Sequence, residues 1–544
     1  MAKTRTMKTP LMFHLLSYTP FSTLLYTPRK SNKSHKFLQP SSSLVLLIFS
    51  LLTFFVVSIL LVIGTVNVSH KHNCLFHSPI QLAFFSAIFP DYSDELTLSK
   101  SEMVPLPSHG VSAMNLSQEE VEFWKQPDNQ GYVPCLDFGI GYRRESPEIT
   151  SEKQRFLVVV ASGGLNQQRN QIVDAVVIAR ILRAALVVPF LHVNFIWGDE
   201  SEFADIFDVE HFKRTLQADV RVVSALPFTH LISTQAVETQ IPFDVSPLWI
   251  RSRFSKQLKQ EGMLVLKGLD SKLSKNLPDD LQKLRCKVAF HALRFSEPIR
   301  ELGNRLARRM WIEGPYIAVH LRLEKDVWAR TGCRTGLGLQ YDQIIQQERN
   351  TRPKYLTGRV NMSYPQRRLA GLCPLNALEV ARLLKALGAP QQARVYIAGG
   401  EPFGGSLALK PLVEEFPHLV TKETLATCEE LLPFANRSSA LAAVDYIVSL
   451  SSDVFLPSHG GNMARAMQGH RAYTGHRKYI RPNKRMMVAY YEDPWISEAE
   501  FGAGMRKLHN KSKGQPEPRT GKRDRDVIAY PVPECMCQRS SGFS

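Results

Sequence analysis

The 544-residue chain lacks several sequence patterns that would point directly to a function. It has no Cys-x-x-Cys pair and no group of histidines and cysteines at zinc-binding spacing, so we expect no metal site. It has no G-x-G-x-x-G, which excludes the dinucleotide fingerprint. No internal repeat is visible, which excludes repeat architectures. What remains is a chain long enough for two domains with substantial cores.

Acidic residues are absent from residues 1–43, and a second basic cluster lies between Arg506 and Arg525. Much of the formal net charge of +17 therefore sits in the two ends of the chain, where charge is usually solvated. No nucleic-acid-binding motif accompanies it, so we expect no nucleic-acid partner.

The run from Leu44 to Gly64 contains no charged residue and is long enough to cross a bilayer as a helix. Lysine and arginine are concentrated before it, which predicts a cytosolic N-terminus and places the bulk of the chain across the membrane. The alternative is a cleaved organellar transit peptide, because the N-terminus is basic and rich in Ser and Thr. The late start and the length of the apolar run argue against a cleaved secretory signal.

Cysteines and glycosylation sequons support placement in an oxidising lumen. All eight cysteines follow the apolar run, and we expect Cys535-Met-Cys537 to be linked in disulfides rather than to a metal. N-glycosylation acceptors with the pattern Asn-x-Ser lie at Asn115, Asn361, Asn436 and Asn510.

Apolar runs alternate with helical patterns between residues 150 and 490. Phe156–Ala161 predicts a buried strand, residues 166–182 a helix and residues 184–190 a second strand. This βαβ unit requires a parallel sheet, and similar junctions recur around residues 316–322 and 395–400. The sequence therefore predicts an α/β protein with two doubly wound halves.

Three segments carry side chains suited to an anionic ligand. A glycine turn, Gly163-Gly164, opens the helix that starts at Asn166, and a helix N-terminus favours anions. The alternative is a tight turn whose polar residues only cap the helix. His320-Leu321-Arg322 ends a predicted strand, where α/β proteins bind ligands.

The Arg322 guanidinium suits a diphosphate, although it could equally form an ion pair with Glu324 or Asp326. The third segment runs from Asp445 through Asp453 to a glycine turn before Met463. Here the alternative is that both aspartates only stabilise a helix end and a turn.

The ordered pieces GGLNQQR, DIFDVEHF, RCKVAFHALRF, HLRLEKD, CPLNALEVARLLKALG, VYIAGGE and SDVFLPSHGGNMARAMQGHR resemble the plant O-fucosyltransferase family. The resemblance covers residues 150–490. It implies a GT-B fold with two Rossmann-like domains facing a cleft, GDP-fucose as donor, inversion at the anomeric carbon and no metal requirement. Together with the apolar run and its basic flank, it leads us to expect a type II membrane protein of the Golgi with a protein or polysaccharide acceptor.

The implied organisation has six parts: a cytosolic tail (1–43), a transmembrane signal anchor (44–66), a stem (67–150), an acceptor-side domain (151–300), a sugar-nucleotide domain (301–495) and a basic tail (496–544). The resemblance gives His320 and Arg322 catalytic roles. The implied donor-binding residues are Gly163, Gly164, Leu165, Asn166, Gln167, Arg169, His320, Leu321, Arg322, Asp445, Asp453, Gly461, Asn462 and Met463. Asn462 and Met463 differ in residue type from the Ser/Thr-Phe pair of the animal relatives.

Three questions stay open at this stage. The general base is undecided among Asp174, Glu324 and Asp326. A related transferase could use UDP-rhamnose on pectin instead of GDP-fucose. A protein that keeps the fold without turnover, such as a glycan-binding Golgi scaffold, is the alternative from another functional class. Metal-dependent transferases usually present an Asp-x-Asp, and the one such string here, Asp524-Arg-Asp526, lies in the basic tail.

Overall fold

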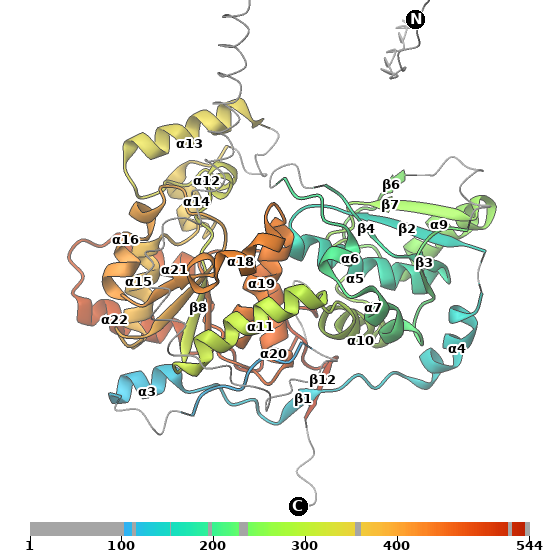
Figure 1. The fold of residues 1–544 in the computed structure, drawn as a ribbon, viewed down its shortest axis with the longest axis horizontal. Coiled ribbons are helices and arrows are strands. Elements are labelled where there is room, and N and C mark those ends of the chain that lie inside the picture. Colours follow the sequence, from blue (N-terminus) through green and yellow to red (C-terminus); the bar gives the residue numbers. More distant parts are fainter. Residues whose placement is uncertain are drawn as a thin grey trace, which may run out of the picture. The chain divides into compact units, whose positions relative to one another are not determined.

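The computed structural model describes residues 103–110, 116–152, 154–193, 198–227, 238–353, 361–519 and 525–538. These residues form two lobes, each built on a parallel β-sheet packed against helices (Figure 1). The prediction of an α/β protein with parallel sheets is therefore confirmed. The predicted anchor at 44–66 lies outside the described residues. Within them, no helix combines the length and apolarity that a bilayer crossing requires.

The first lobe is built on strand β2 (Phe156–Ala161), whose apolar side chains are almost all buried, as in a parallel strand covered on both faces. Helix α5 (Leu165–Leu182) follows it directly, one residue earlier than the sequence predicted. The sheet order is β5 (Val222–Val223), β3 (Ala185–Val187), β2, β7 (Met263–Lys267) and β6 (Glu238–Gln240), with β4 (Phe190–Leu191) paired to β2. The other helices are α6 (Phe203–Ile206), α7 (Val209–Leu216), α9 (Pro247–Glu261), α10 (Asp279–Lys287) and the π-helix η2 (Val288–Ala292).

The second lobe has four parallel strands in the order β10 (Leu419–Thr421), β9 (Arg394–Ala398), β8 (Tyr316–His320) and β11 (Val454–Pro457). The edge position of β11 tolerates Pro457, which cannot donate a backbone hydrogen bond. Its helices are α11 (Glu297–Ile312), α12 (Lys325–Thr331), α13 (Leu339–Thr351), α14 (Tyr364–Leu369), α15 (Ala377–Ala386), α16 (Ser406–Glu415), α17 (Lys422–Leu425), α18 (Cys428–Leu431), the 3-10 helix η4 (Leu432–Phe434), α19 (Ser438–Ser451), α20 (Asn462–Tyr473), α21 (Lys484–Tyr491) and α22 (Glu498–His509).

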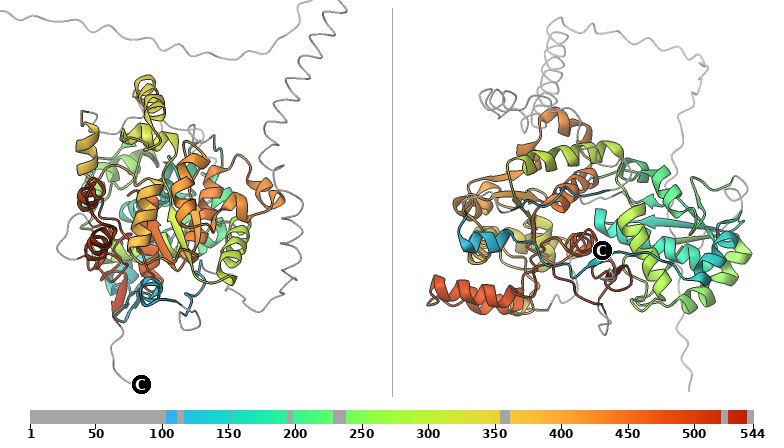
Figure 2. Two further views of the ribbon diagram at one scale, coloured as in Figure 1. Left: turned by 90° about the vertical axis from the view of Figure 1, so that its left-hand side faces the viewer. Right: turned by 90° about the horizontal axis from the view of Figure 1, so that it is seen from below.

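Helices α11, α19 and α20 lie between the two sheets, which stay side by side when the molecule is seen from below (Figures 1 and 2). Gly303 of α11 packs so closely on α19 that a Cβ atom there would come within 3.0 Å of Ile447. Helices α19 and α20 also contact α5 of the first lobe. One apolar cluster therefore runs from Ile172 of α5 to Tyr446 and Met467 of the second lobe. This shared core fixes the position of the carboxyl ends of the strands in one sheet relative to those in the other.

The segments predicted as a stem and a basic tail differ from that expectation where they are described. Helix α3 (Gln118–Trp124) buries Phe123 and Trp124 in the second lobe, and α4 (Ile140–Thr150) places Tyr142 against Asp219 of the first. Strand β1 (Tyr132–Pro134) pairs antiparallel with β12 (Met536–Gln538). The sequence shows no periodicity here because these residues pack individually on the lobes.

Disulfides join the two end segments to each other and to the first lobe. Cys537 bonds Cys135 and Cys535 bonds Cys286, and a third disulfide joins Cys333 to Cys373. The prediction that Cys535-Met-Cys537 is disulfide-linked is confirmed. Asn361, Asn436 and Asn510 are all exposed, as glycan acceptors must be, whereas Asn115 lies outside the described residues.

Candidate functional site

The carboxyl ends of β8 and β11 bring together two motifs that are far apart in the sequence. His320 ends β8 and pairs with Pro457, the last residue of β11. The Ser458 amide donates to the His320 carbonyl at 3.0 Å, and the Arg322 amide donates to the Ser458 hydroxyl at 3.0 Å. The His320-Leu321-Arg322 and Ser458–Met463 segments therefore lie together at the carboxyl ends of the strands in the second sheet.

Arg322 forms one of the two contacts that the sequence left as alternatives, the ion pair with Glu324. Its Nε donates to a Glu324 carboxylate oxygen at 3.1 Å, and Glu324 also accepts from the Gly400 amide at 3.2 Å. The two terminal nitrogens form no hydrogen bond or ion pair with any described residue, and the side chain is 31% exposed. Glu324 therefore orients the guanidinium while leaving its two-nitrogen edge open to a ligand.

His320 and His459 are neutral side chains beside this arginine. Burial lowers the pKa of His320 well below 6.5, with Arg322 and His459 adding to the effect. Burial, then Lys484 and Arg322, lower the pKa of His459 to about 3. His320 is 9% exposed, and its Nδ1 has no hydrogen-bond partner among the described residues. These values suit hydrogen bonding to a ligand better than proton transfer at neutral pH.

The glycine turn of the first lobe is held from inside by Gln167. The Gln167 side-chain oxygen accepts from the Gly164 amide at 3.1 Å, and a Cβ atom at Gly163 would lie 2.4 Å from that oxygen. Gly163 also has φ +89°, a conformation that favours glycine. Gly163, Gly164 and Gln167 thus shape the turn, while Leu165 is buried beneath it.

Arg169 differs from its predicted role as a donor contact. Its guanidinium lies 4.4 Å from the centroid of the Tyr446 ring and donates to the Ala289 carbonyl at 2.9 Å. The residue is 5% exposed, so it belongs to the core between the lobes. The correction follows from helical geometry: four residues after Leu165, Arg169 lies on the same buried face.

The glycine turn faces the N-terminus of α20 across the two lobes. Asn166 Nδ2 lies 3.3 Å from the Met463 sulfur, and Asn170 Nδ2 lies 3.4 Å from the Asn462 side-chain oxygen. Gly461 precedes α20 and is exposed. The two segments that the sequence singled out as anion-receptive turns therefore meet.

Asp270 lies at this meeting point, and sequence reasoning missed it. One carboxylate oxygen accepts from Asn170 Nδ2 at 3.2 Å and the other from Asn462 Nδ2 at 3.5 Å. Asp270 comes three residues after β7, whose five residues read MLVLK. An acid just past an apolar strand was the available signal, because the carboxyl ends of parallel strands share one edge.

Asp445 and Asp453 occupy different places from those expected. Asp445 accepts from the Tyr396 hydroxyl at 2.7 Å, the Gly399 amide at 3.1 Å and Lys422 Nζ at 3.2 Å. Burial raises the pKa of its carboxyl group. Both carboxylate oxygens of Asp445 accept hydrogen bonds, so this residue stabilises the loop that follows β9.

Asp453 requires a correction. It precedes β11 and accepts from the Tyr316 amide at 3.0 Å and the His109 amide at 2.8 Å. Tyr316 starts β8, so Asp453 lies at the amino end of the sheet, about 16 Å of extended chain away from Ser458. The run Ser451–Met463 contains a short strand, and residues before and after a strand lie at opposite ends of it.

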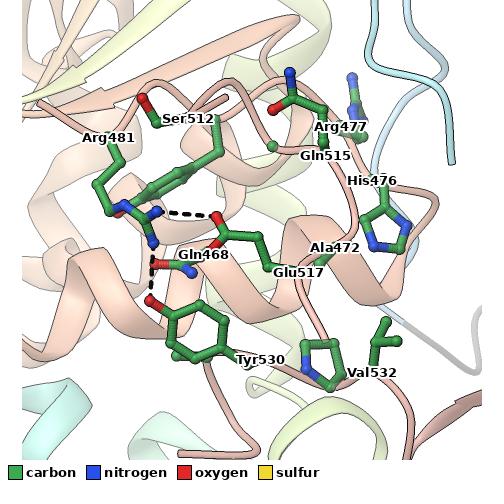
Figure 3. Close-up of a pocket in the computed structure, with 14 residues that line it drawn as sticks. Gln468, Ala472, His476, Arg477, Arg481, Ser512, Gln515, Glu517, Tyr530 and Val532 are labelled. Atoms are coloured by element: carbon green, nitrogen blue, oxygen red, sulfur yellow. Dashed lines mark hydrogen bonds and ion pairs between the residues drawn. The ribbon is translucent and has the colours of Figure 1, made fainter. Parts of the chain in front are cut away.

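Two hollows flank these elements. The smaller holds about 20 Å³, room for roughly one water molecule. It is crossed by hydrogen bonds from Arg481 to Glu517 and Tyr530 (Figure 3), so it offers no ligand site. A groove of about 640 Å³ lies between α12 and α15 and includes Trp328, whose indole donates to the Leu323 carbonyl. That volume suits a small organic ligand, but Arg322 is not among the residues that line the groove.

Metal ligands do not gather in the part of the chain that the structure describes, where no three His, Cys, Asp or Glu side chains form a cluster. Asp526, from the one Asp-x-Asp string, instead accepts from buried Arg285 at 2.9 Å.

Known proteins resemble this chain over most of its length. O-fucosyltransferase 37 of Arabidopsis thaliana is 69% identical over 447 residues, 81% of this chain and 80% of that protein. O-fucosyltransferase 20 of Brassica napus is 55% identical over 85% of this chain and 81% of its own length. A structure of POFUT1 in complex with GDP-fucose aligns with 60% of this chain and 98% of its own at 12% identity and a TM-score of 0.38. Residues 156–474 match the family model of GDP-fucose protein O-fucosyltransferases, and the chain belongs to that family.

Proposed function

We propose that this chain is an enzyme that transfers fucose from GDP-fucose to a hydroxyl group of a protein or cell-wall glycan. We further propose that the two lobes act as a GT-B fold, with the donor between the facing strand edges. Family membership supports the donor. The single observation that carries the site is the open guanidinium edge of Arg322, held by Glu324 at the carboxyl end of β8.

Arg322 acts on the leaving group. In the reaction, the bond between the fucose anomeric carbon and the GDP β-phosphate oxygen breaks, and negative charge develops on that oxygen. The two free guanidinium nitrogens and the amides at the α20 N-terminus donate to the diphosphate. Because these donors are fixed before the reaction, the developing charge is stabilised without a metal. His320 and His459 remain neutral donors or acceptors beside it.

Asp270 accepts the proton from the acceptor hydroxyl, whose oxygen attacks the anomeric carbon from the face opposite GDP and inverts it. Asp270 is placed at the meeting of the two lobes, opposite the α20 N-terminus. The sequence candidates fit less well. Burial raises the pKa of Asp174 to about 7, but that residue is 1% exposed and binds the Lys272 and Leu273 amides. Glu324 is engaged by Arg322, and Asp326 lies 3.6 Å from Arg330.

Turnover of nucleotide sugars tests the function. The full-length chain in detergent is incubated with GDP-fucose or UDP-rhamnose in excess EDTA, and release of GDP or UDP is measured with binding of each donor. We expect GDP release from GDP-fucose at an undiminished rate in EDTA.

Each other outcome points elsewhere. UDP release alone identifies the rhamnosyltransferase alternative. Binding of GDP-fucose with no release in the presence of candidate acceptors identifies a non-catalytic glycan or nucleotide binder. Activity that EDTA abolishes and manganese restores would contradict metal independence.

We propose a single-pass type II topology in the Golgi membrane, with both lobes in the lumen. Three disulfides and three exposed sequons support an oxidising, glycosylating compartment. Protease added to sealed microsomes is expected to remove only a small N-terminal piece. Digestion of both lobes under those conditions would overturn the orientation.

A further inference from the structure

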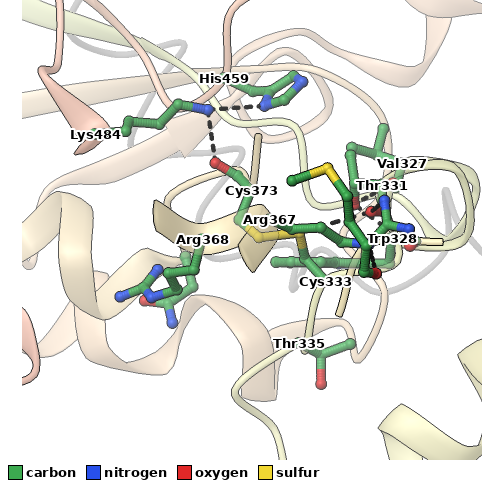
Figure 4. Close-up of a disulfide and its surroundings, with 12 residues drawn as sticks. Val327, Trp328, Thr331, Cys333, Thr335, Arg367, Arg368, Cys373, His459 and Lys484 are labelled. Atoms are coloured by element: carbon green, nitrogen blue, oxygen red, sulfur yellow. Dashed lines mark hydrogen bonds between the residues drawn. A yellow bond between two sulfur atoms is a disulfide. The ribbon is translucent and has the colours of Figure 1, made fainter. Parts of the chain in front are cut away.

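Lys484, the first residue of α21, is a partly buried cation without a counter-charge. Its ammonium group donates to the Cys373 carbonyl at 2.6 Å and to His459 Nδ1 at 3.1 Å (Figure 4). Both partners are neutral. Among the described residues, no carboxylate oxygen lies within ion-pair distance of Lys484. Burial lowers its pKa to about 8, because an amine in this position loses solvation, while the nearby charges of Glu379 and Arg368 act in opposite directions.

The charged groups around Lys484 do not neutralise it. Glu379 of α15 is the acid whose charge it feels, but Glu379 binds Arg368 of α14 and the Asn376 amide. On the other side, His459 is neutral and also feels the charge of Arg322. Lys484 and Arg322 are therefore two cations that both act on His459, and Arg322 is paired with Glu324.

We propose that Lys484 binds the diphosphate of the nucleotide sugar together with Arg322, an inference that rests on the proposed function. An ammonium group has three protons, and the two neutral partners take two of them. The third is available to a phosphate oxygen. Because an ammonium can only donate, His459 Nδ1 accepts from it, which puts the ring proton of neutral His459 on Nε2.

A purely structural role for Lys484 would be to hold the Cys373 loop against α21. The Cys333–Cys373 disulfide already fixes that loop, and Leu375 donates to the Ser458 carbonyl at 2.9 Å. The loop therefore has other anchors. The structural role and the ligand-binding role predict different GDP affinities when arginine replaces Lys484 and when the pH is varied.

The test is calorimetric titration of GDP into the full-length wild type, Lys484→Met, Lys484→Arg and the control Lys507→Met, which removes an exposed lysine from α22. Loss of one charge-assisted hydrogen bond is expected to weaken GDP binding by Lys484→Met roughly tenfold to a hundredfold. Lys484→Arg keeps the charge and should stay close to the wild type. Lys507→Met should bind GDP as the wild type does.

The pH dependence gives a second, independent readout. A lysine with a pKa of about 8 is charged below that pH and neutral above it. Wild-type affinity for GDP should therefore fall between pH 7 and pH 9, whereas Lys484→Arg, which does not titrate there, should show a smaller fall. The arginine variant keeps this test valid even where Lys484→Met folds poorly.

Two results would overturn the inference while leaving the proposed function intact: wild-type GDP affinity in Lys484→Met, or the same pH dependence in the wild type and Lys484→Arg. A wild type that binds no GDP at pH 7 would instead remove the proposed function and the inference with it.

Discussion

Arg322→Lys is expected to lower turnover of GDP-fucose about a hundredfold or more, nearly as far as Arg322→Ala. Lysine keeps the charge but has a single nitrogen in place of the guanidinium fork. That nitrogen can satisfy Glu324 or the diphosphate, whereas arginine serves Glu324 through Nε and presents two other nitrogens. The measurement is steady-state GDP release, with thermal unfolding of each variant followed in parallel.

Arg309→Lys is the matched control, because Arg309 binds Glu430 through both terminal nitrogens at 2.8 Å, away from the strand edges. It should lower the melting temperature slightly and leave turnover unchanged. A stable Arg322→Lys enzyme with normal turnover would show that Arg322 is only the partner of Glu324.

Asp270→Asn is expected to lower turnover by a factor of roughly 10² to 10⁴ while leaving KM for GDP-fucose unchanged. The amide keeps the size of the side chain but cannot take a proton from the acceptor hydroxyl. Its contact with Asn170 or Asn462 can be retained through the remaining oxygen. Initial rates at varied GDP-fucose concentration separate the two parameters.

Asp270 could instead serve to hold the two lobes together, and Asp205→Asn is the control for that structural role. Asp205 of α6 lies 3.1 Å from Arg437 of the second lobe and is therefore also a cross-lobe carboxylate. Its loss should leave turnover unchanged. If Asp270→Asn raises KM or lowers the melting temperature without a specific loss of kcat, Asp270 is a structural bridge and another group is the base.

Local periodicity predicted those parts of the fold that are defined by local sequence. Helix α5 and strand β2 follow from one 3.6-residue pattern and one continuous apolar run, and both lie within one residue of the prediction. The pairing of β1 with β12 could not be predicted in this way. Each strand has three residues. Cys135 and Cys537, whose disulfide joins the two segments, are 402 residues apart in the sequence.

The candidate site was predictable as a set of strand ends but not as a set of contacts. His320 ends a recognisable strand and Arg322 follows it, and the structure places both at the carboxyl end of β8 in the second sheet. Asp453 was expected among the donor-binding residues, but it precedes β11 and so lies at the amino end of the sheet, as the alternative of a turn residue implies. No local sequence pattern singles out Lys484. Its proposed role rests on the lack of a carboxylate within ion-pair distance among the described residues, which only the folded structure reveals.

Direct titration of GDP into the wild type, Arg322→Ala and Asp270→Asn tests the central claim that the nucleotide diphosphate is bound at the β8 edge while the proton is taken at Asp270. The account predicts that Asp270→Asn binds GDP as tightly as the wild type and that Arg322→Ala binds it at least about tenfold more weakly, with unchanged melting temperatures for both. Equal GDP affinity in all three proteins would contradict it, because the diphosphate would then be held somewhere other than at Arg322.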